Sequence, residues 1–345
     1  MLSNDEIYMQ RCFDLAANGG KNVRPNPLVG AILVHQNRII GEGYHHQFGS
    51  AHAEVEAINS VKTQDRDLIP DSTLYVSLEP CNYHGKTPAC SRLIIDQRIR
   101  KLVVSTEDPN PIIKGNSLQY LERMGITITR NVLLEKGKNL IKAFSKNIKT
   151  SKPYVIIKYA ESKDHFIGKQ NERIKLSNDY SDIFVHKLRD YADGIMVGTN
   201  TALTDNPSLT TRLIDGDSPV RIVLDRQLKI PTSFNIYNKK AGTIIINQKK
   251  NELKGNIDFC KMDFARSDFL NELLLTLFRK KVYVLLVEGG TQLINSFLHT
   301  GEWDEAVIIT TPVLLNSGIK APSFSGQRYR TEVAGDNKIS FVKKN

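Results

Sequence analysis

The chain has 345 residues, of which 40% are hydrophobic and 24% are charged, which is long enough for two domains and typical of a globular protein. No apolar run approaches the roughly 18 residues of a spanning helix, and no apolar signal-peptide segment follows the N-terminus, so we expect a cytoplasmic protein without membrane contact. The net charge of +10 comes from lysines and arginines scattered along the chain, which favours attraction of phosphorylated small molecules, or a merely basic composition, over nucleic-acid binding.

The first half of the chain alternates helical and strand-like patterns. A helix is predicted over the first 20 residues, with Ser3 or Asn4 as its N-cap. The elements predicted after it are, in chain order, strands Val29 to Val34 and Arg38 to Gly43, a helix Ala51 to Val61, a strand Thr73 to Leu78, a helix from near Cys90 to Gln97, a strand Lys101 to Thr106, a helix Leu118 to Met124 and a strand Ile126 to Thr129. This order predicts a compact three-layer α/β unit.

His52, Cys81 and Cys90 are residues of the types that bind zinc, and Glu54 follows the histidine by two positions. One imidazole and two thiolates leave the fourth tetrahedral position of zinc open for water, whereas a structural site is normally closed by a fourth protein ligand. With His52 and Glu54 both in the first turn of a helix, about 200° apart around its axis, Glu54 can face that water without binding the metal. The pattern predicts a zinc-dependent hydrolytic deaminase with Glu54 as the catalytic proton carrier.

Eight residues separate the two cysteines, where most zinc deaminases have two. With Arg24-Pro25-Asn26-Pro27-Leu28-Val29-Gly30 before the zinc motif and Glu107-Asp108-Pro109-Asn110-Pro111 after it, this insertion resembles the bifunctional pyrimidine deaminase and reductase family of riboflavin biosynthesis. The resemblance implies a cytidine-deaminase-like domain with substrate contacts at Asn26, His45, Lys86 and Asn110. A solvated histidine is the alternative for His45, and Asn82 and Tyr83 stand where the family has a serine and a histidine.

The stretch from Ser145 to Lys152 is polar, lysine-rich and followed by Pro153, which predicts a boundary near residue 150 between a deaminase domain at 1–149 and a second domain at 150–345. Alternating strands and helices in the second domain predict a largely parallel sheet, with ligands at the carboxyl ends of its strands. The predicted strands are Tyr154 to Tyr159, Gly194 to Gly198, Val220 to Leu224, Thr243 to Ile246, Val282 to Val287 and Val307 to Thr310, and the helices are Tyr180 to Arg189, Ser267 to Phe278 and Gln292 to Leu298.

The segment Glu288-Gly289-Gly290-Thr291 follows an apolar strand and opens a helix, where backbone N–H groups can meet a phosphate. The G-x-G-x-x-G dinucleotide fingerprint is absent from the sequence. On this feature alone, an ordinary strand-to-helix turn remains the alternative.

Further segments resemble the reductase half of the same family, from about residue 153 to residue 315: Lys158-Tyr159-Ala160-Glu161-Ser162, Val197-Gly198-Thr199-Asn200-Thr201, the run from Asp205 to Arg212, and Trp303-Asp304-Glu305. The resemblance implies a dihydrofolate-reductase-like α/β domain. It also implies NADPH contacts at Ala160, Thr201, Asp205, Gly290, Thr291, Gln292, Leu293, Ile294, Asn295 and Ser296, and substrate contacts at Arg189, Leu209, Arg212 and Glu288.

Three arginines carry the expected phosphate contacts of this domain. Arg189 and Arg212 suit a ribose 5-phosphate because a guanidinium group pairs with phosphate oxygens in a bidentate fashion, although a surface salt bridge is the alternative for each. We add Arg226, directly after a strand end, as a partner for the cofactor 2′-phosphate, with an ordinary surface arginine as the alternative. The family's S-L-D-G reads Ser162-Lys163-Asp164-His165 here, and Arg173 and Lys175 replace a serine and a tryptophan, so the nicotinamide environment is expected to differ.

The resemblance implies that one zinc ion and NADPH serve two reactions, deamination of a phosphorylated diaminopyrimidine and reduction of its ribosyl group to ribityl. A polynucleotide deaminase shares the zinc motif, but it does not explain the second domain. A non-catalytic zinc scaffold does not explain Glu54. We expect a small phosphorylated pyrimidine as the substrate, a homo-oligomer, and unpaired core or near-surface thiols at Cys12 and Cys260.

Overall fold

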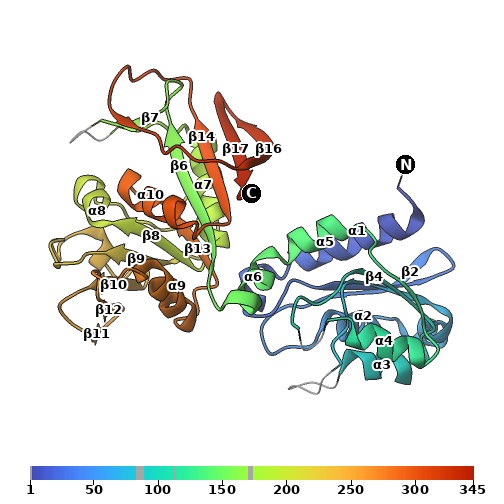
Figure 1. The fold of residues 1–345 in the computed structure, drawn as a ribbon. Coiled ribbons are helices and arrows are strands. Elements are labelled where there is room, and N and C mark those ends of the chain that lie inside the picture. Colours follow the sequence, from blue (N-terminus) through green and yellow to red (C-terminus); the bar gives the residue numbers. More distant parts are fainter. Residues whose placement is uncertain (1, 83–88, 112–113, 170–173) are drawn as a thin grey trace. The chain divides into compact units, whose positions relative to one another are not determined.

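The computed structural model describes residues 2–82, 89–111, 114–169 and 174–345, and the chain divides into two compact units, Met1–Thr150 and Ser151–Asn345 (Figure 1). Each unit has its own sheet and its own hydrophobic core. Across the described ranges, every helix falls short of the length and apolar character that crossing a membrane requires.

The first unit is built on a five-stranded sheet with the order β2-β1-β3-β4-β5. β1 runs antiparallel to β2 and β3, whereas β3, β4 and β5 are parallel to one another. The strands are β1 (Gly30–His35), β2 (Arg38–Tyr44), β3 (Thr73–Leu78), β4 (Lys101–Thr106) and β5 (Thr127–Thr129). The helices are α1 (Asn4–Ala17), α2 (Ala53–Asn59), α3 (Cys90–Asp96), α4 (Asn116–Arg123), α5 (Leu134–Leu140) and α6 (Lys142–Thr150), with short 3₁₀ helices η1 (Gly20–Val23) and η2 (Thr63–Asp71).

Helices cover both faces of this sheet, as the three-layer prediction requires. Met9 of α1 packs in one buried cluster with Ile32 of β1. Leu33, the next residue of β1, lies in a different cluster with Ala57 of α2 and Leu118 of α4. Because successive strand residues point to opposite faces, α1 covers one face and α2 and α4 cover the other.

Two glycines of β2 let α2 lie directly on the sheet. A Cβ atom at Gly41 would come within 2.3 Å of the carbonyl oxygen of Ala57, and one at Gly43 would come within 2.3 Å of the amide nitrogen of Ala57. A larger residue at either position would push α2 away from β2. These glycines therefore fix the position of the helix that directly follows His52.

The second unit has a ten-stranded sheet with the order β11-β12-β10-β9-β8-β13-β6-β14-β17-β16. The strands from β12 to β14 in this order are parallel, and the pairs at the two ends are antiparallel, which confirms the largely parallel sheet. The strands are β6 (Tyr154–Glu161), β8 (Gly194–Gly198), β9 (Val220–Leu224), β10 (Thr243–Asn247), β11 (Glu252–Lys254), β12 (Ile257–Lys261), β13 (Val284–Val287), β14 (Glu305–Thr310), β16 (Gln327–Ala334) and β17 (Asn337–Lys343). A small separate sheet pairs β7 (Phe166–Gly168) with β15 (Ile319–Lys320).

Apolar residues of this sheet alternate between two buried faces. Val155 and Ile157 of β6 pack with Leu273 of α9 and Ile294 of α10, whereas Ile156, which lies between them, is buried outside that cluster. α7 also lies outside it and contacts β13 and β16. The helices of this unit are α7 (Asp179–Tyr191), α8 (Thr199–Asp205), α9 (Phe269–Arg279) and α10 (Thr291–Thr300), and a short 3₁₀ helix is η3 (Asn235–Tyr237).

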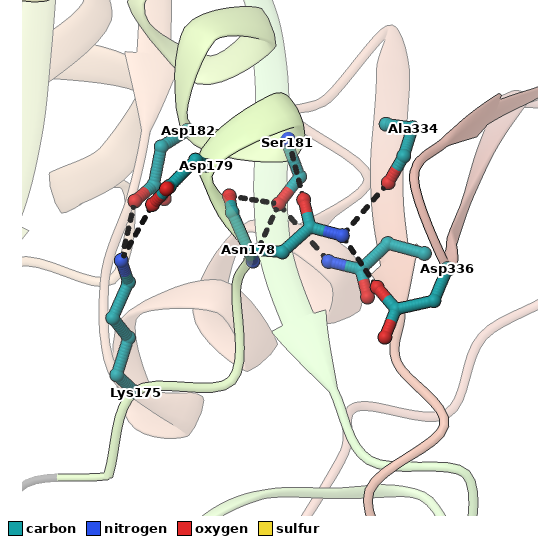
Figure 2. Close-up of polar contacts among 8 residues, drawn as sticks. Lys175, Asn178, Asp179, Ser181, Asp182, Ala334 and Asp336 are labelled. Atoms are coloured by element: carbon teal, nitrogen blue, oxygen red, sulfur yellow. Dashed lines mark hydrogen bonds and ion pairs between the residues drawn. The ribbon is translucent and has the colours of Figure 1, made fainter.

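The N-terminus of α7 is tied to the turn between β16 and β17, as Figure 2 shows. Asn178 caps the helix, because its Oδ1 accepts a hydrogen bond from the Ser181 amide at 2.8 Å. The Nδ2 of the same side chain donates to the Ala334 carbonyl at 2.9 Å and to Asp336 Oδ1. One asparagine thus holds the helix start against the C-terminal hairpin.

One prediction of local structure was wrong, and two features were not predicted. α2 spans only Ala53–Asn59, and His52 is its N-cap with an extended backbone (φ −77°, ψ 162°) instead of a residue of its first turn. The polar stretch in which the domain boundary was predicted is mostly helical, because α6 runs as far as Thr150. The β16–β17 hairpin extends beyond residue 315, where the resemblance ended, and it was not predicted.

Candidate active sites

The three predicted zinc ligands lie together in the first unit. His52 comes from the N-cap of α2, Cys81 from the segment after β3, and Cys90 from the first position of α3. The Nδ1 atom of His52 lies 3.5 Å from Cys81 Sγ and 3.3 Å from Cys90 Sγ. Tetrahedral zinc with bonds of about 2.3 Å to sulfur and about 2.0–2.1 Å to nitrogen separates such atoms by about 3.6 Å. The donor set and its spacing therefore fit zinc, and within the described ranges these three residues form the group able to hold a metal ion.

The local charges favour a thiolate, which is the form of cysteine that binds zinc. The hydrogen bond from the Cys90 side chain lowers the pKa of Cys81 to about 4, and His52 acts in the same direction. The backbone amide of Cys90 also donates to Cys81 Sγ at 3.4 Å. Cys81 is thus prepared as an anionic ligand by its neighbours.

Glu54 is buried beside this ligand set, with 3% of its surface exposed. Its carboxyl group interacts with the Cys90 side chain, and burial, assisted by the charge of Cys81, raises the pKa of Glu54 to about 7. A carboxyl group at this place can accept and release a proton near neutral pH, and it belongs to the second residue of α2, not to the ligand set. The structure thus brings the predicted catalytic residue next to the metal ligands.

His45 and Asn26 form a pair at the edge of the same site. His45 Nδ1 lies 3.0 Å from the Ala51 carbonyl oxygen, so this nitrogen carries the proton and Nε2 accepts from Asn26 Nδ2 at 3.1 Å. The His45 ring meets His52 edge-on at 5.6 Å, and burial lowers its pKa. His45 is therefore a buried, neutral residue that orients Asn26, and the solvated alternative for it was wrong.

Asn110 lies on a loop that Glu79 organises. The two carboxylate oxygens of Glu79 accept hydrogen bonds from the backbone amides of Asp108, Gly115 and Ser117, at 3.1, 2.8 and 3.2 Å, and from Ser117 Oγ at 2.6 Å. Asp108 in turn accepts from the Asn110 amide at 2.8 Å. Glu79 thereby links the segment of Cys81 to the loop that carries Asn110.

The segment between the two cysteines is described at only two of its eight positions. Lys86, the predicted phosphate contact, and Tyr83, one of the departures from the family, lie outside the described residues. Asn82, the other departure, accepts a hydrogen bond from Ser91 Oγ of α3 at 2.7 Å. This hydrogen bond therefore holds the start of the segment after Cys81 against α3.

In the second unit, the segment Glu288 to Thr291 connects a strand to a helix, as the sequence predicts. Glu288 follows β13 directly, and Gly290 is the N-cap of α10. The Gly290 amide donates to Thr201 Oγ1 of α8 at 2.9 Å, and a Cβ atom at Gly290 would lie 3.2 Å from that oxygen. The turn and α8 both follow the carboxyl ends of parallel strands, which is where open α/β sheets bind their ligands.

Arg189, Glu288 and Lys158 form a charged group beside this turn. Arg189 Nη2 donates to Glu288 Oε2 at 2.9 Å, and Lys158 Nζ lies 4.0 Å from Glu288 Oε1. Burial would raise the pKa of Glu288, but Arg189 and Lys158 outweigh it and hold that pKa at about 2, so Glu288 is ionised. Arg189 Nε, Glu288 Oε1 and Thr291 Oγ1 are buried without a hydrogen-bond partner among the described residues. Such atoms are costly unless a ligand satisfies them.

The other residues predicted to contact ligands differ in how far their side chains are exposed to solvent. Leu293 and Ile294 point into the hydrophobic core, so only their backbone is available to a cofactor. Leu209 is buried and has a positive φ of 53°, whereas Arg212 is exposed. Ala160, Asp205 and Asn295 are half-buried, and Gln292 and Ser296 are exposed.

Arg226 lies after the end of β9, as predicted, and is exposed. Its Nε donates to Gln248 Oε1 at 2.8 Å, and its guanidinium group is 6.0 Å from the centre of the Phe264 ring. The preceding Asp225 is fully buried and accepts from the amides of Lys229 and Ile230, which fixes the backbone at this strand end.

The departures from the family pattern have structural explanations where they are described. His165 has a positive φ of 62° at the position of the family's glycine, and histidine tolerates this conformation better than most residues. Lys175 forms ion pairs with Asp182 at 2.9 Å and Asp179 at 3.6 Å in the first turn of α7 (Figure 2). Arg173 lies outside the described residues.

Two residues of these sites escaped the sequence analysis, Glu79 and His186. His186 of α7 is buried, and its Nδ1 accepts hydrogen bonds from the backbone amides of Arg212 and Leu213. Glu79 stands directly before the Pro80-Cys81 pair, so its position next to the zinc motif was a usable signal. No local pattern marks His186, because its partners lie 26 and 27 residues further along the chain.

Comparison with known proteins covers both units. Residues 2–106 match the cytidine and deoxycytidylate deaminase zinc-binding region, and residues 153–340 match the RibD C-terminal domain. The chain is 32% identical to the riboflavin biosynthesis protein RibD of Aquifex aeolicus, over 99% of this chain and 98% of that protein, and 33% identical to RibD of Bacillus amyloliquefaciens, over 95% and 90%. A crystal structure of a diaminohydroxyphosphoribosylaminopyrimidine deaminase/5-amino-6-(5-phosphoribosylamino)uracil reductase from Thermotoga maritima matches with a TM-score of 0.90 and 31% identity, over 99% of each chain.

These similarities bear out the expected fold classes, a cytidine-deaminase-like first unit and a dihydrofolate-reductase-like second unit. The first unit has the zinc-type ligand set of its family, and a reductase unit of this family implies NADPH. Because the match runs through both units over nearly the whole length of the relatives, the chain belongs to the RibD family of bifunctional riboflavin biosynthesis enzymes, which join a zinc deaminase to a reductase.

Proposed function

We propose that the first unit deaminates 2,5-diamino-6-ribosylamino-4(3H)-pyrimidinone 5′-phosphate and that the second reduces the ribosyl side chain of the product to ribityl, giving 5-amino-6-ribitylaminouracil 5′-phosphate. One observation carries the proposal: each unit holds a buried polar cluster in which a binding position or a hydrogen-bonding atom is not used by the described residues. In the first unit, three side chains can bind a zinc ion, which takes four ligands. In the second, unpaired atoms of Arg189, Glu288 and Thr291 gather around the turn after β13.

In the deaminase site, His52, Cys81 and Cys90 would hold zinc, which supplies a water molecule acidic enough to act as a nucleophile at neutral pH. Glu54, buried beside Cys90, moves one proton from the attacking water to the pyrimidine nitrogen and then a second from the new hydroxyl group to the amino group, which leaves as ammonia.

Substrate contacts of the deaminase follow from the groups around this centre. Asn26, held by His45, presents its amide to the edge of the pyrimidine. Asn110 reaches the same ring from the loop that Glu79 organises, and Lys86 binds the phosphate. The substrate is thereby recognised by amide groups at its ring and by a cation at its phosphate.

In the reductase site, NADPH would supply a hydride for C1 of the sugar in its opened, imine-like form. The Gly289–Gly290 turn and the start of α10 would hold its diphosphate through backbone amides, with contacts from Thr201, the run Gly290 to Ser296, Ala160 and Asp205. Arg226 would bind its 2′-phosphate.

The reductase substrate is expected to contact Arg189, Leu209, Arg212 and Glu288. Arg189 and Arg212 bind its phosphate in bidentate fashion, and Leu209 contacts it. Glu288, kept ionised by Arg189 and Lys158, accepts hydrogen bonds from the ribosyl hydroxyls. This arrangement orients the sugar toward the hydride donor without covalent chemistry by the protein.

Residues 1–149 form the deaminase domain and residues 150–345 the reductase domain in this proposal, and the protein assembles as a homo-oligomer in the cytoplasm. The four cysteines are free, which suits a reducing compartment. Light scattering coupled to gel filtration measures the assembly, and a monomeric mass would contradict that part.

A coupled assay of ammonia release and NADPH oxidation tests the function. The wild type should do both when given the diaminopyrimidine phosphate, and it should release no ammonia from RNA. Glu54→Gln should keep zinc but lose deamination by roughly 10²–10⁴-fold or more, because the amide cannot carry the proton, while it still oxidises NADPH with substrate that is already deaminated. Cys81→Ala is the matched control that loses zinc. Full ammonia release by Glu54→Gln would refute the assigned role.

A further inference from the structure

His186 sits inside the second unit, on the helix that carries the phosphate-binding Arg189. It is 2% exposed, and its Nδ1 lies 2.9 Å from the backbone nitrogen of Arg212 and 3.3 Å from that of Leu213. Both neighbours are N–H donors. The nitrogen they face must therefore be the unprotonated one, which leaves the proton of the imidazole on Nε2.

The surroundings keep this imidazole neutral. Burial is the largest cause that lowers the pKa of His186, the positive charges of Arg189 and Arg212 act in the same direction, and Glu288 and Asp182 oppose them, with a resulting pKa of about 4. A protonated ring would turn an N–H toward two other N–H groups, so the hydrogen bonds exist only with the neutral form.

The segment that His186 holds has no regular secondary structure of its own. Residues 206–219 contain neither helix nor strand, and the chain there includes the predicted substrate contacts Leu209 and Arg212. A segment of this kind takes its conformation from the side chains that bind its backbone.

α7 supplies three such side chains. Besides His186, Arg189 Nη1 donates to the Thr210 carbonyl at 3.3 Å, and Asp190 Oδ1 accepts from the Asp217 amide at 2.9 Å. His186 and Arg189 are three residues apart and therefore lie on one face of the helix. Of these three, His186 contacts the backbone of Arg212 itself.

We propose that His186 is a positioning residue of the reductase, which fixes the main chain at Arg212 so that the guanidinium groups of Arg189 and Arg212 bind one substrate phosphate together. The proposal rests on the proposed function, which places that phosphate at the two arginines. Arg212 has an exposed side chain and depends on its backbone for its direction, whereas Arg189 is already held by Glu288.

The test compares two substrates on the full-length, zinc-loaded enzyme with saturating NADPH: 5-amino-6-(5-phosphoribosylamino)uracil and the same compound without its phosphate. His186→Ala should raise KM for the phosphorylated substrate at least about 10-fold, because a charge-assisted contact is lost, with kcat changed less than about 3-fold. Its kcat/KM for the substrate without phosphate should stay within about 3-fold of the wild type. Competitive inhibition by inorganic phosphate should weaken in parallel.

Two variants separate positioning from general damage. In His186→Asn, the amide Oδ1 replaces the Nδ1 acceptor, and KM for the phosphorylated substrate should return to within about 3-fold of the wild type. Lys187→Ala, an exposed neighbour on the same helix, should behave as the wild type. An equal loss for both substrates in His186→Ala, or no recovery in His186→Asn, overturns the proposal. If His186→Ala does not fold, His186→Phe, which fills the same space without an Nδ1 acceptor, takes its place in the comparison with His186→Asn.

Arg212→Ala tests the phosphate site itself, so it distinguishes a failure of the positioning role of His186 from a failure of the proposed function. If Arg212→Ala loses activity only with the phosphorylated substrate but His186→Ala does not, the phosphate site stands and the positioning role is refuted. If Arg212→Ala treats both substrates as the wild type does, the phosphate site itself is wrong, and the positioning role falls with it.

Discussion

Glu79 accepts four hydrogen bonds from residues 29 to 38 positions further along the chain, and His186 accepts two from 26 and 27 positions further along. Both side chains act on the backbone of a loop that carries predicted substrate contacts. Candidate ligand residues could be named from the sequence because they belong to short motifs. The residues that hold those loops were not, since their partners are set only by the folded chain.

Arg226 is expected to determine the choice between NADPH and NADH. A charge-assisted hydrogen bond to the 2′-phosphate contributes about 1.5–3 kcal/mol, so Arg226→Ala should weaken NADPH binding roughly 10-fold or more and leave NADH binding nearly unchanged. Parallel binding titrations of the two cofactors measure the difference. Arg266→Ala, which removes another exposed arginine paired with Asp268, is the control and should change neither affinity. An equal loss for both cofactors in Arg226→Ala would remove Arg226 from the site.

His186 also predicts how the stability of the second unit depends on pH. The unfolded chain binds a proton on this histidine below its ordinary pKa of about 6.5, whereas the folded chain binds it only below about 4. The stabilisation is therefore complete above pH 6.5 and is lost as the pH falls from 6.5 to 4. His186→Asn cannot titrate, so its free energy of unfolding should fall less steeply over that range.

The fluorescence of the chain's single tryptophan, Trp303, follows this unfolding, because Trp303 is buried in the second core. Arg189, Arg212, Glu288 and Asp182 surround His186 in both proteins, so the difference between the two pH curves isolates the histidine. Parallel curves would show that His186 is not kept neutral by the fold.

At the scale of elements, the strands were predicted well and the segments around them less well. β3, β4, β8 and β9 have the predicted bounds, because buried strands of parallel sheets are short apolar runs. β16 is exposed along nearly its whole length, so it lacks the continuous apolar run that marks a buried strand. His52 fell outside its predicted helix because an N-cap residue keeps an extended backbone although it borders the helical pattern.

The hydrogen bonds that join the start of α7 to the β16–β17 hairpin should contribute measurably to the free energy of unfolding of the second unit. Asn178→Ala removes the helix cap and both hydrogen bonds to the β16–β17 turn, and should lower the free energy of unfolding of the second unit by about 1–2 kcal/mol. Asp336→Ala removes only one of these bonds and should cost less. Denaturant titrations followed by Trp303 fluorescence give both values, and an Asn178→Ala protein as stable as the wild type would contradict the anchor.

At the scale of the whole molecule, the two units have separate cores, and within the described ranges the group of residues able to hold a metal ion lies in the first unit. A ligand that binds the folded state stabilises the unit that holds it. Removing zinc with a chelator should therefore lower the thermal midpoint of the first unit by several degrees and leave the Trp303 transition of the second unit in place.

Far-ultraviolet circular dichroism, which reports on both units, and Trp303 fluorescence, which reports on the second, separate the two transitions. Adding NADPH should raise the thermal midpoint of the Trp303 transition and leave that of the first unit unchanged. An equal shift of both transitions on zinc removal would mean that the two cores unfold together.

The position of β17 has a consequence for the timing of synthesis. It follows every other strand of its sheet in the chain, yet it lies inside that sheet, between β14 and β16. At about 5–20 residues per second, the ribosome needs roughly 10 to 40 s to make the second unit after the first is complete. During that interval the first unit can already fold and take up zinc, whereas the second lacks the strand that joins β16 to its sheet and the turn that anchors α7. We therefore expect the first unit of a newborn chain to become active before the second.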